Sequence, residues 1–240
     1  MNPISQALAE RYSCRDFSNT PLESELLDDI LNDAMRSPSW SNTQPYRIAL
    51  AQGKTKEHLS AELQRRYAKA VKIQRGSTFT KLTAFISGND GLPKGDFKQA
   101  LSYPDELQKR RLVTAKGLYS LLDIQRNDAD KRDAQTGRNF DFFGAPSVLF
   151  VFVHDGLGVY SVLDAGILLQ SIMLAAQSRG VATCSQGALA LWRAPLDKHF
   201  DIPRDYKLLC GISLGYASEH LVNTYKSERL PVKELLIPSR

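Results

Sequence analysis

The segment RYSCRDF near the N-terminus places two arginines and a serine at alternate positions. If this segment is extended, the side chains of Arg11, Ser13 and Arg15 project to the same side. Guanidinium groups bind phosphate oxygens in a bidentate manner, so the spacing indicates a site for a phosphate-bearing ligand. Arg229, which follows Lys226 in the C-terminal segment, could close the same site. The alternative is that these arginines lie at the surface and bond to helix carbonyls.

A second polar segment, RSPSWSNTQPYR at residues 36–47, is richer in hydrogen-bonding side chains than a helix end requires. Pro38 explains why the preceding helix ends, because the residue before a proline is disfavoured in helical geometry. It does not explain the hydroxyl and amide side chains that follow, namely Ser39, Ser41, Asn42 and Gln44. The segment is therefore either a polar turn or a loop that holds a ligand. For Trp40, dimer packing and a place in the wall of a substrate pocket are both open.

The segment GVATCSQGAL combines small and polar residues, with Cys184, Ser185, Gln186 and Gly187 at its centre. We do not expect Cys184 to be a nucleophile, because no histidine lies nearby in the sequence to activate it. The segment is either an ordinary turn from a strand to a helix or a backbone platform whose N–H groups face a flat polar ring.

The sequence GISLG at residues 211–215 matches the G-x-S-x-G pattern of hydrolase nucleophiles. That motif requires a sharp turn between a strand and a helix, followed by an acid and a histidine. After Ser213 the candidates are Glu219 and His220, which are adjacent, and no helix clearly follows. We therefore predict an ordinary strand here. The glycine-rich motifs of dinucleotide-binding Rossmann domains and P-loop NTPases do not occur, which disfavours both classes.

The composition is typical of a soluble globular protein, with 240 residues of which 42% are hydrophobic and 24% charged. One domain over residues 1–240 is favoured over two small ones. No apolar run is long enough to span a membrane. Three widely spaced cysteines favour reduced thiols and a cytoplasmic protein, and the histidines do not occur at metal-ligand spacing.

The net charge of +5 is concentrated in residues 54–81 and 108–116. Aromatic side chains are not interleaved there as stacking platforms for a nucleic acid would require. We therefore expect a solvated basic helix face, whose field would also attract an anionic small molecule.

Apolar periodicity and turn residues predict the elements that position these groups. We expect helices at residues 2–12, 21–38, 55–74, 104–126, 161–180 and 188–200, and strands at residues 46–53, 145–153 and 206–217. Residues 75–104 are expected to be irregular, and residues 223–240 to form an extended arm. The strand at 145–153 is apolar throughout, which favours burial of both its faces. Because helices and strands mix without strict alternation, the sequence predicts an α+β fold with one central sheet.

In their order and spacing, these segments resemble the FMN-dependent nitroreductase family. The resemblance rests on RYSCRDF, SPSWSNTQPYR, LDAGILLQSIMLAAQSRGVATCSQGAL, GISLGYA and ERLPVKELL. Residues 54–138 match less well and are longer than in the smallest family members, as an insertion would be. Residues 121–146 are similar to the branch that includes nitrobenzoate and dinitroaniline reductases.

The resemblance implies a mainly antiparallel central sheet flanked by helices. It also implies an intertwined homodimer with an extended C-terminal arm and one FMN at each interface. Family members hold the flavin phosphate and ribityl chain with residues that correspond to Arg11, Tyr12, Ser13, Arg15 and Arg229.

Three further regions of the family's flavin site have counterparts here. The loop that reaches the flavin from the partner subunit corresponds to Pro38, Ser39, Trp40, Ser41, Asn42 and Gln44. The backbone along the isoalloxazine ring corresponds to Cys184, Ser185, Gln186 and Gly187, and a mid-chain asparagine that can touch the flavin corresponds to Asn139. The chain departs from the family pattern at Tyr46, where many members have tryptophan, at Gln186, where one branch has glutamate, and at the C-terminal lysine, whose place falls to Lys226 or Ser227.

The resemblance implies that FMN carries the chemistry. NADPH or NADH would pass a hydride to the flavin N5 and leave, and a nitroaromatic or quinone acceptor would then take its place, in a two-electron ping-pong cycle. The expected partners are thus a small aromatic acceptor and a second copy of the chain, not a nucleic acid or a membrane. Other flavin reactions are alternatives, namely enone reduction, reductive dehalogenation and flavin fragmentation. A nucleic-acid-binding protein and a serine hydrolase are more remote.

Overall fold

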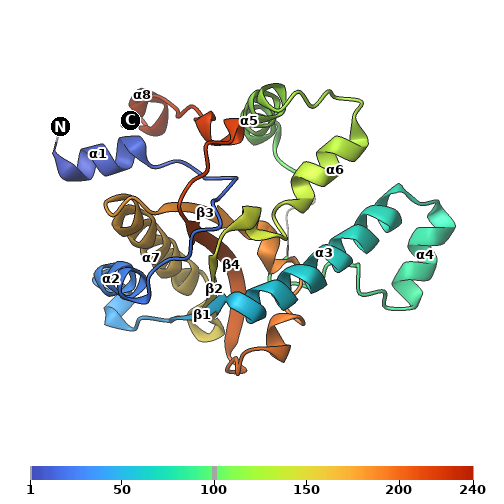
Figure 1. Ribbon diagram of the computed structural model, residues 1–240, viewed down its shortest axis with the longest axis horizontal. Coiled ribbons are helices and arrows are strands. Elements are labelled where there is room, and N and C mark those ends of the chain that lie inside the picture. Colours follow the sequence, from blue (N-terminus) through green and yellow to red (C-terminus); the bar gives the residue numbers. More distant parts are fainter. Residues whose placement is uncertain (1, 99–101, 240) are drawn as a thin grey trace.

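The computed structural model describes residues 2–98 and 102–239, which form eight α-helices around one four-stranded sheet (Figure 1). The strands lie in the order β1-β2-β4-β3, and each neighbouring pair is antiparallel. Their bounds are β1 Tyr46–Gln52, β2 Ser147–His154, β3 Ala182–Gln186 and β4 Tyr206–Gly215. The predicted α+β fold with a central antiparallel sheet is confirmed.

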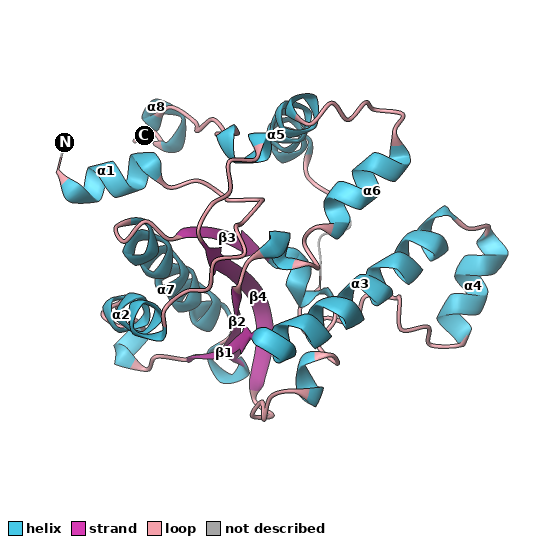
Figure 2. Cartoon of the chain, in the orientation of Figure 1, coloured by secondary structure: helices cyan, strands magenta, loops and turns pink. Residues whose placement is uncertain are grey.

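β2 lies in the interior of the sheet and is rich in β-branched and aromatic residues. All of its side chains except that of His154 are buried. Phe150 and Phe152 belong to one hydrophobic cluster, whereas Leu149 and Val151, which alternate with them along the strand, belong to two others. The prediction of a strand covered on both faces is confirmed, and Figure 2 shows helices on either side of the sheet.

Helices cover both faces of this sheet. Their bounds are α1 Pro3–Glu10, α2 Ser24–Ala34, α3 Gly53–Arg75, α4 Thr78–Ile86, α5 Asp105–Leu121, α6 Ala129–Gly137, α7 Val159–Gln177 and α8 Val232–Leu235. α2 and α7 pack together over one face, where Ile30 shares a cluster with Leu168 and Ile172. Leu59 and Leu63 of α3 are buried in the opposite cluster. Each such side chain contributes roughly 1.5–3 kcal/mol through burial.

The N-terminal helix begins as its sequence predicts. The Asn2 side chain accepts a hydrogen bond from the Ser5 N–H at 2.8 Å, and Pro3 takes the first helical position. α1 ends at Glu10, and Arg11 already has extended backbone angles. The arginine-rich segment therefore lies outside the helix.

The prediction of an irregular segment at residues 75–104 is wrong for the part that forms α4. The Ser77 hydroxyl caps this helix by accepting a hydrogen bond from the Thr80 N–H at 3.2 Å. α3 and α4 form a hairpin that projects away from the sheet (Figure 1). The chain then returns to the core, where the Lys94 N–H donates to the Leu191 carbonyl at 2.9 Å.

The helix predicted at residues 104–126 is too long. It ends at Leu121 as α5, and the separate helix α6 follows. Asp123 between them has a positive φ of 50°, which breaks the helical ladder. The predicted extended arm is also interrupted, by the short helix α8.

The α-helix predicted at residues 188–200 is wrong. Two short 3-10 helices, Gly187–Leu191 and Leu196–Lys198, occupy this region instead. Pro195 between them has no N–H to continue a helical ladder. Trp192 is buried in the core and pairs across a single β-bridge with Lys94, so tertiary packing overrides the local pattern.

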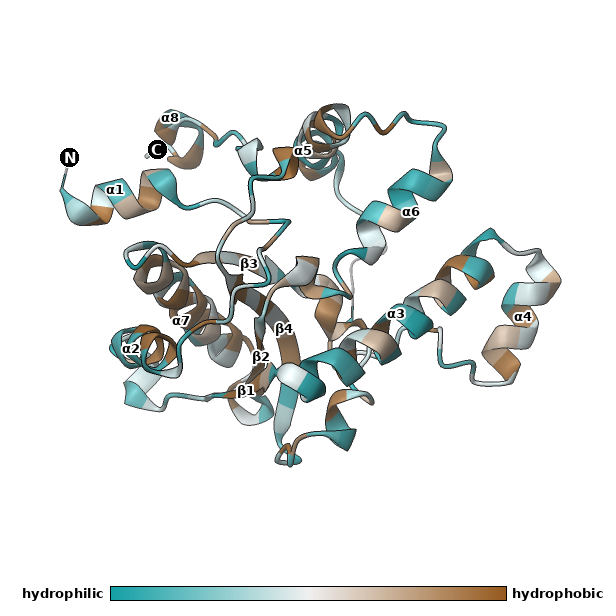
Figure 3. Ribbon diagram, viewed as in Figure 1, coloured by the Kyte–Doolittle hydropathy of each residue, from teal (hydrophilic) through white to brown (hydrophobic). Residues whose placement is uncertain are grey.

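α7 is apolar around most of its circumference (Figure 3). By length and composition alone it could cross a membrane, a test that core helices of soluble proteins also pass. Leu168 and Ile172 are fully buried, whereas Val159 and Leu163 are 72% and 56% exposed. α7 therefore has one stripe in the core and a second apolar stripe without cover.

Candidate functional site

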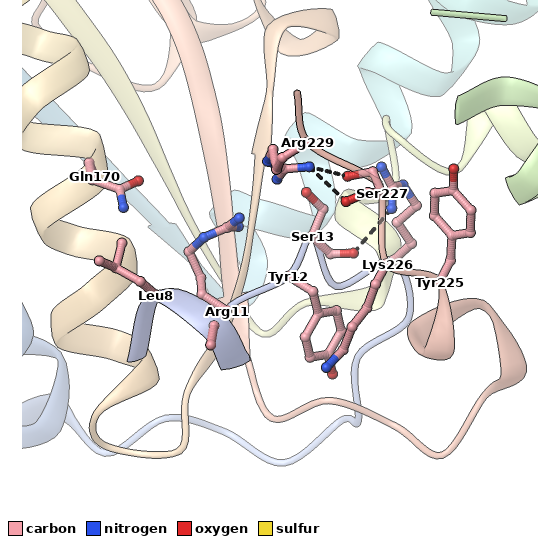
Figure 4. A pocket seen from close by; sticks show the side chains of 11 residues that line it. Leu8, Arg11, Tyr12, Ser13, Gln170, Tyr225, Lys226, Ser227 and Arg229 are labelled. Atoms are coloured by element: carbon pink, nitrogen blue, oxygen red, sulfur yellow. Dashed lines mark hydrogen bonds between the residues drawn. The ribbon is translucent and has the colours of Figure 1, made fainter. Parts of the chain in front are cut away.

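The two ends of the chain enclose a cavity of about 530 Å³, which we call the terminal pocket (Figure 4). Its walls come from α1 and the segment after it, from α7, and from the segment before α8. The lining residues are Leu8, Ala9, Arg11, Tyr12, Ser13, Arg15, Gln170, Tyr225, Lys226, Ser227 and Arg229. Its volume lies within the range of small-molecule sites, roughly 300–1,000 Å³.

A single β-bridge places the arginine-rich segment at the edge of the sheet. Ser13 pairs in parallel with Thr183 of β3, and the Cys14 N–H donates to the Thr183 carbonyl at 3.0 Å. The backbone is extended here, and the structure brings Arg11, Ser13 and Arg15 together on the terminal pocket. The Arg15 guanidinium also donates to the Ser13 carbonyl at 3.2 Å.

Arg229 and its neighbours form the facing wall. The Arg229 guanidinium donates to the Ser227 hydroxyl at 2.7 Å and to the carbonyls of Ser227 and Glu228 at 2.9 and 3.0 Å. These bonds hold the guanidinium beside the pocket (Figure 4). Lys226 and Ser227 both line the pocket, so both candidates for the C-terminal position lie close to it.

Four lining residues are not among those predicted from the sequence: Leu8, Ala9, Gln170 and Tyr225. Gln170 could have been found from the sequence, because it is an amide in the middle of the largely apolar stretch GILLQSIML. Tyr225 could not have been found in this way, because its position depends on packing against α5. Its ring lies so close to Gly117 of α5 that a side chain there would meet it.

The charge of the terminal pocket has one sign. Arg11, Arg15, Lys226 and Arg229 line it, and none of its described lining residues is a carboxylate. Within the described part of the chain, none of these four cations forms an ion pair. The pocket therefore offers a positive field that no internal counter-ion cancels, which suits a phosphate group.

The basic helix α3 differs from the pocket because many of its cations are paired. Lys69 and Arg65 each bond to Asp90 at 2.7 Å, and these two hydrogen bonds lower the pKa of Asp90 to about 2. Arg66 bonds to Glu62 at 3.0 Å. This local neutralisation weakens the case for a nucleic-acid surface along α3.

β3 presents no reactive thiol. Cys184 is only 4% exposed, and burial raises the pKa of its thiol to about 11. Burial likewise raises the pKa of the neighbouring Cys14 to about 12. Because the thiolate is the nucleophilic form, the expectation that Cys184 is not a nucleophile agrees with its surroundings.

The Gln186 side chain turns into the protein rather than toward the terminal pocket. It donates to the Asn139 carbonyl at 2.9 Å and accepts a hydrogen bond from the Ser213 hydroxyl. Asn139 lies with Arg15 on a separate cavity of about 100 Å³. At Ser185 and Gly187, by contrast, the chain is exposed, so this segment offers mainly backbone to a ligand.

Ser213 lies within β4, is fully buried and pairs with Cys184 of β3. No turn follows it, because β4 continues to Gly215. The prediction of an ordinary strand is confirmed, and GISLG is not a nucleophile elbow.

The loop at residues 38–44 does not line the terminal pocket of its own chain. Ser41, Asn42 and Gln44 have positive φ angles of 47°, 55° and 47°. Left-handed backbone costs non-glycine residues roughly 1–3 kcal/mol each and persists only where the surroundings impose it.

Several bonds impose this loop conformation. The Trp40 N–H donates to both carboxylate oxygens of buried Asp164, at 3.2 and 3.1 Å, and the Ser39 hydroxyl accepts from the Gln44 N–H at 3.0 Å. The Trp40 ring lies 4.2 Å from that of Tyr160 and is 52% exposed. The loop is thus held in a fixed shape that faces away from its own core.

Fold and pocket first define a class: an α+β protein with a cationic pocket between the two ends of its chain. In residues 2–98 and 102–239, no cluster of His, Cys, Asp or Glu could hold a metal ion. The family model described as the nitroreductase family matches residues 8–216. The chain belongs to the nitroreductase family.

Known relatives cover nearly the whole chain. The 4-nitrobenzoate reductase of Pseudomonas putida is 34% identical over 93% of this chain and 88% of its own length. The nitrobenzene nitroreductase of Ectopseudomonas oleovorans is 31% identical over 91% of this chain and 88% of its own length.

Solved structures agree in fold. The FMN- and NADPH-dependent nitroreductase NfnB from sphigopyxis sp. strain HMH matches with a TM-score of 0.83 and 28% identity over 99% of both chains. The FMN-dependent nitroreductase NfnB from Mycobacterium smegmatis, solved in complex with NADPH, also has a TM-score of 0.83. It is 26% identical, over 99% of this chain and 98% of that one.

Proposed function

We propose that this chain is an FMN-dependent oxidoreductase that takes hydride from NADPH or NADH and reduces nitroaromatic or quinone-type acceptors by a two-electron ping-pong mechanism. The observation that carries the proposal is the terminal pocket, a cavity lined by four cationic side chains in a chain of the nitroreductase family. The relatives named as reductases of 4-nitrobenzoate and nitrobenzene support an aromatic acceptor.

The pocket residues fit the phosphate and ribityl chain of FMN. Arg11 and Arg15 can each offer a bidentate guanidinium to phosphate oxygens, and Arg229 lines the same cavity from the C-terminal segment. The hydroxyls of Ser13 and Tyr12 provide neutral donors for the ribityl oxygens. A phosphate dianion would supply the counter-charge that the pocket lacks.

The isoalloxazine ring would lie along the end of β3. There residues 184–187 would offer backbone N–H groups, and the bond from Gln186 would hold Asn139 in place. Bound FMN supplies the hydride chemistry itself, and the chain binds and orients it. The buried thiols and Ser213 take no part in this scheme.

We propose that the enzyme works as an intertwined homodimer. Large apolar side chains are exposed on α1, on the outer stripe of α7 and near α8, including Leu8, Leu163 and Ile237. Burying them between two copies would remove apolar surface from water, at about 25 cal/mol per Å². In such a dimer the loop at residues 38–44 would reach the cofactor of the partner subunit.

Mixed dimers test whether this loop acts on the partner's site. One chain carries Arg11→Ala, and the other carries Asn42→Ala with Gln44→Ala. If the loop serves the partner, the pocket that lacks Arg11 also receives the altered loop, so this one site has every defect. The other site combines an intact pocket with an intact loop. We expect one FMN per mixed dimer to bind with wild-type affinity, measured by titration of tagged and purified mixed dimers. Two defective sites would show instead that the loop serves its own chain, and a monomeric wild type in sedimentation would contradict the dimer.

We further propose that residues 1–240 form a single domain, in which residues 54–138 are an insertion, and that the enzyme acts in the cytoplasm. The hairpin of α3 and α4 lies within this insertion and is tied back to the core at Lys94. Limited proteolysis should release no stable fragment that lacks the insertion.

Absorbance spectroscopy tests the proposed reaction. The purified protein should be yellow, or become so with added FMN, and NADPH or NADH should bleach it in the absence of oxygen. Addition of 4-nitrobenzoate or a quinone should restore the colour. A protein that never binds FMN contradicts the proposal. A flavin reoxidised by enones or halogenated aromatics, but not by nitroaromatics or quinones, would favour another flavin reaction.

A further inference from the structure

We propose that Asn223 is a positioning residue that fixes the two walls of the terminal pocket relative to each other. The inference rests on the proposed function, because the pocket is assigned there to the FMN phosphate. Asn223 itself does not line the pocket, so it acts through the residues that do.

The Asn223 side chain joins the two ends of the chain. Its Oδ1 accepts a hydrogen bond from the Arg15 N–H at 2.9 Å, and its Nδ2 donates to the Asp16 carbonyl at 2.7 Å. The same Nδ2 donates to the Ser218 carbonyl at 3.1 Å. The residue is 9% exposed, so these bonds form where water competes little for them.

These bonds connect the segments that form the two walls of the pocket. Arg15 lines one wall, and Tyr225 of the facing wall follows Asn223 by two residues. Among the described residues, every hydrogen bond from residues 219–229 to residues 11–18 is made by Asn223. An amide alone can satisfy one backbone donor and two carbonyls in this arrangement.

The partners of Asn223 are themselves anchored. The Ser218 hydroxyl donates to the Asp16 carboxylate at 2.6 Å, and Arg138 bonds to the same carboxylate at 3.1 Å. Phe17 and Ala217 form an antiparallel bridge next to them. Asn223 therefore connects these anchored residues to the segment that contains Lys226 and Arg229.

The test is Asn223→Ala, which removes the acceptor for the Arg15 N–H and the donor for the two carbonyls without adding a charge near the phosphate. We expect the affinity for FMN to fall about tenfold or more, because buried donors and acceptors are left unsatisfied. The affinity for riboflavin, which lacks the phosphate, should change less than twofold. Fluorescence titration of the flavin-free protein measures both constants.

Thr224→Ala is the matched control, because the one hydrogen bond of the Thr224 hydroxyl to the described residues is to the Leu221 carbonyl within the same turn. It should leave both constants unchanged. A role in stability alone would lower the unfolding temperature of Asn223→Ala but leave the ratio of the FMN and riboflavin constants at the wild-type value. That result would overturn the inference. A wild type that binds FMN no better than riboflavin would instead refute the phosphate pocket.

Two further measurements cover a variant that does not fold. Asn223→Ser is milder and should also lower the preference for FMN over riboflavin. Hydrogen exchange on the wild type needs no variant: the Arg15 amide should be protected before FMN is added. Fast exchange at that amide would overturn the inference.

Discussion

Replacing Arg11 with alanine should weaken FMN binding about tenfold to a hundredfold. Hydrogen bonds to charged groups contribute roughly 1.5–3 kcal/mol, and each 1.4 kcal/mol corresponds to about a factor of ten in affinity. Arg11 has no ion-pair partner within the described chain, so its loss removes attraction for the phosphate without freeing a carboxylate. Equilibrium titration of the flavin-free protein with FMN, at fixed ionic strength, measures the effect.

Arg204→Ala is the control for this prediction, because it removes the same charge from an exposed residue that does not line the terminal pocket. It should change the FMN constant less than twofold. Combining Arg11→Ala with Arg229→Ala should weaken binding further, since the two residues lie on facing walls. If Arg11→Ala binds FMN as Arg204→Ala does, the phosphate does not occupy the terminal pocket.

The sequence predicts best where local rules decide the structure. β2 and α7 are long apolar runs that end at turn residues, and both lie where they were expected. The alternation of Arg11, Ser13 and Arg15 predicts a shared side because an extended backbone has a period of two residues. The bridge between Ser13 and Thr183, which makes that backbone extended, was not visible in the sequence.

Prediction failed where burial or distant partners decide. α6 is largely polar and buries no side chain. α4 buries only Ala84 and leaves the apolar side chains of Phe79, Leu82 and Phe85 exposed, so packing against the core did not mark it as a helix. Residues 188–200 have apolar residues at helical spacing, but the sheet buries Trp192 outside any helix. Asn223 looks like a surface residue in the sequence, because Arg15 is 208 positions away.

Replacing Trp192 with alanine should lower the free energy of unfolding by about 3–5 kcal/mol, as large cavities in a core do. The ring is 1% exposed and lies 5.4 Å from that of Phe140. Its Nε1–H donates to the Leu92 carbonyl at 3.0 Å, so the change also breaks a tie between the core and the segment after α4. Urea unfolding of the flavin-free protein measures the loss.

The chain contains two tryptophans, and Trp40 provides the control. Because Trp40 is 52% exposed, Trp40→Ala should cost less than about 1 kcal/mol, as surface substitutions usually do. Trp192→Phe separates the two causes, since it keeps most of the packing and removes the bond to Leu92. If the segment at residues 87–98 is tied down by that bond, Trp192→Phe should speed amide exchange there while α7 stays protected. Equal losses of unfolding free energy for Trp40→Ala and Trp192→Ala would mean that the core does not centre on Trp192. Unchanged amide exchange in Trp192→Phe would mean that other contacts, such as the bond from Arg193 to Asp96, hold the segment.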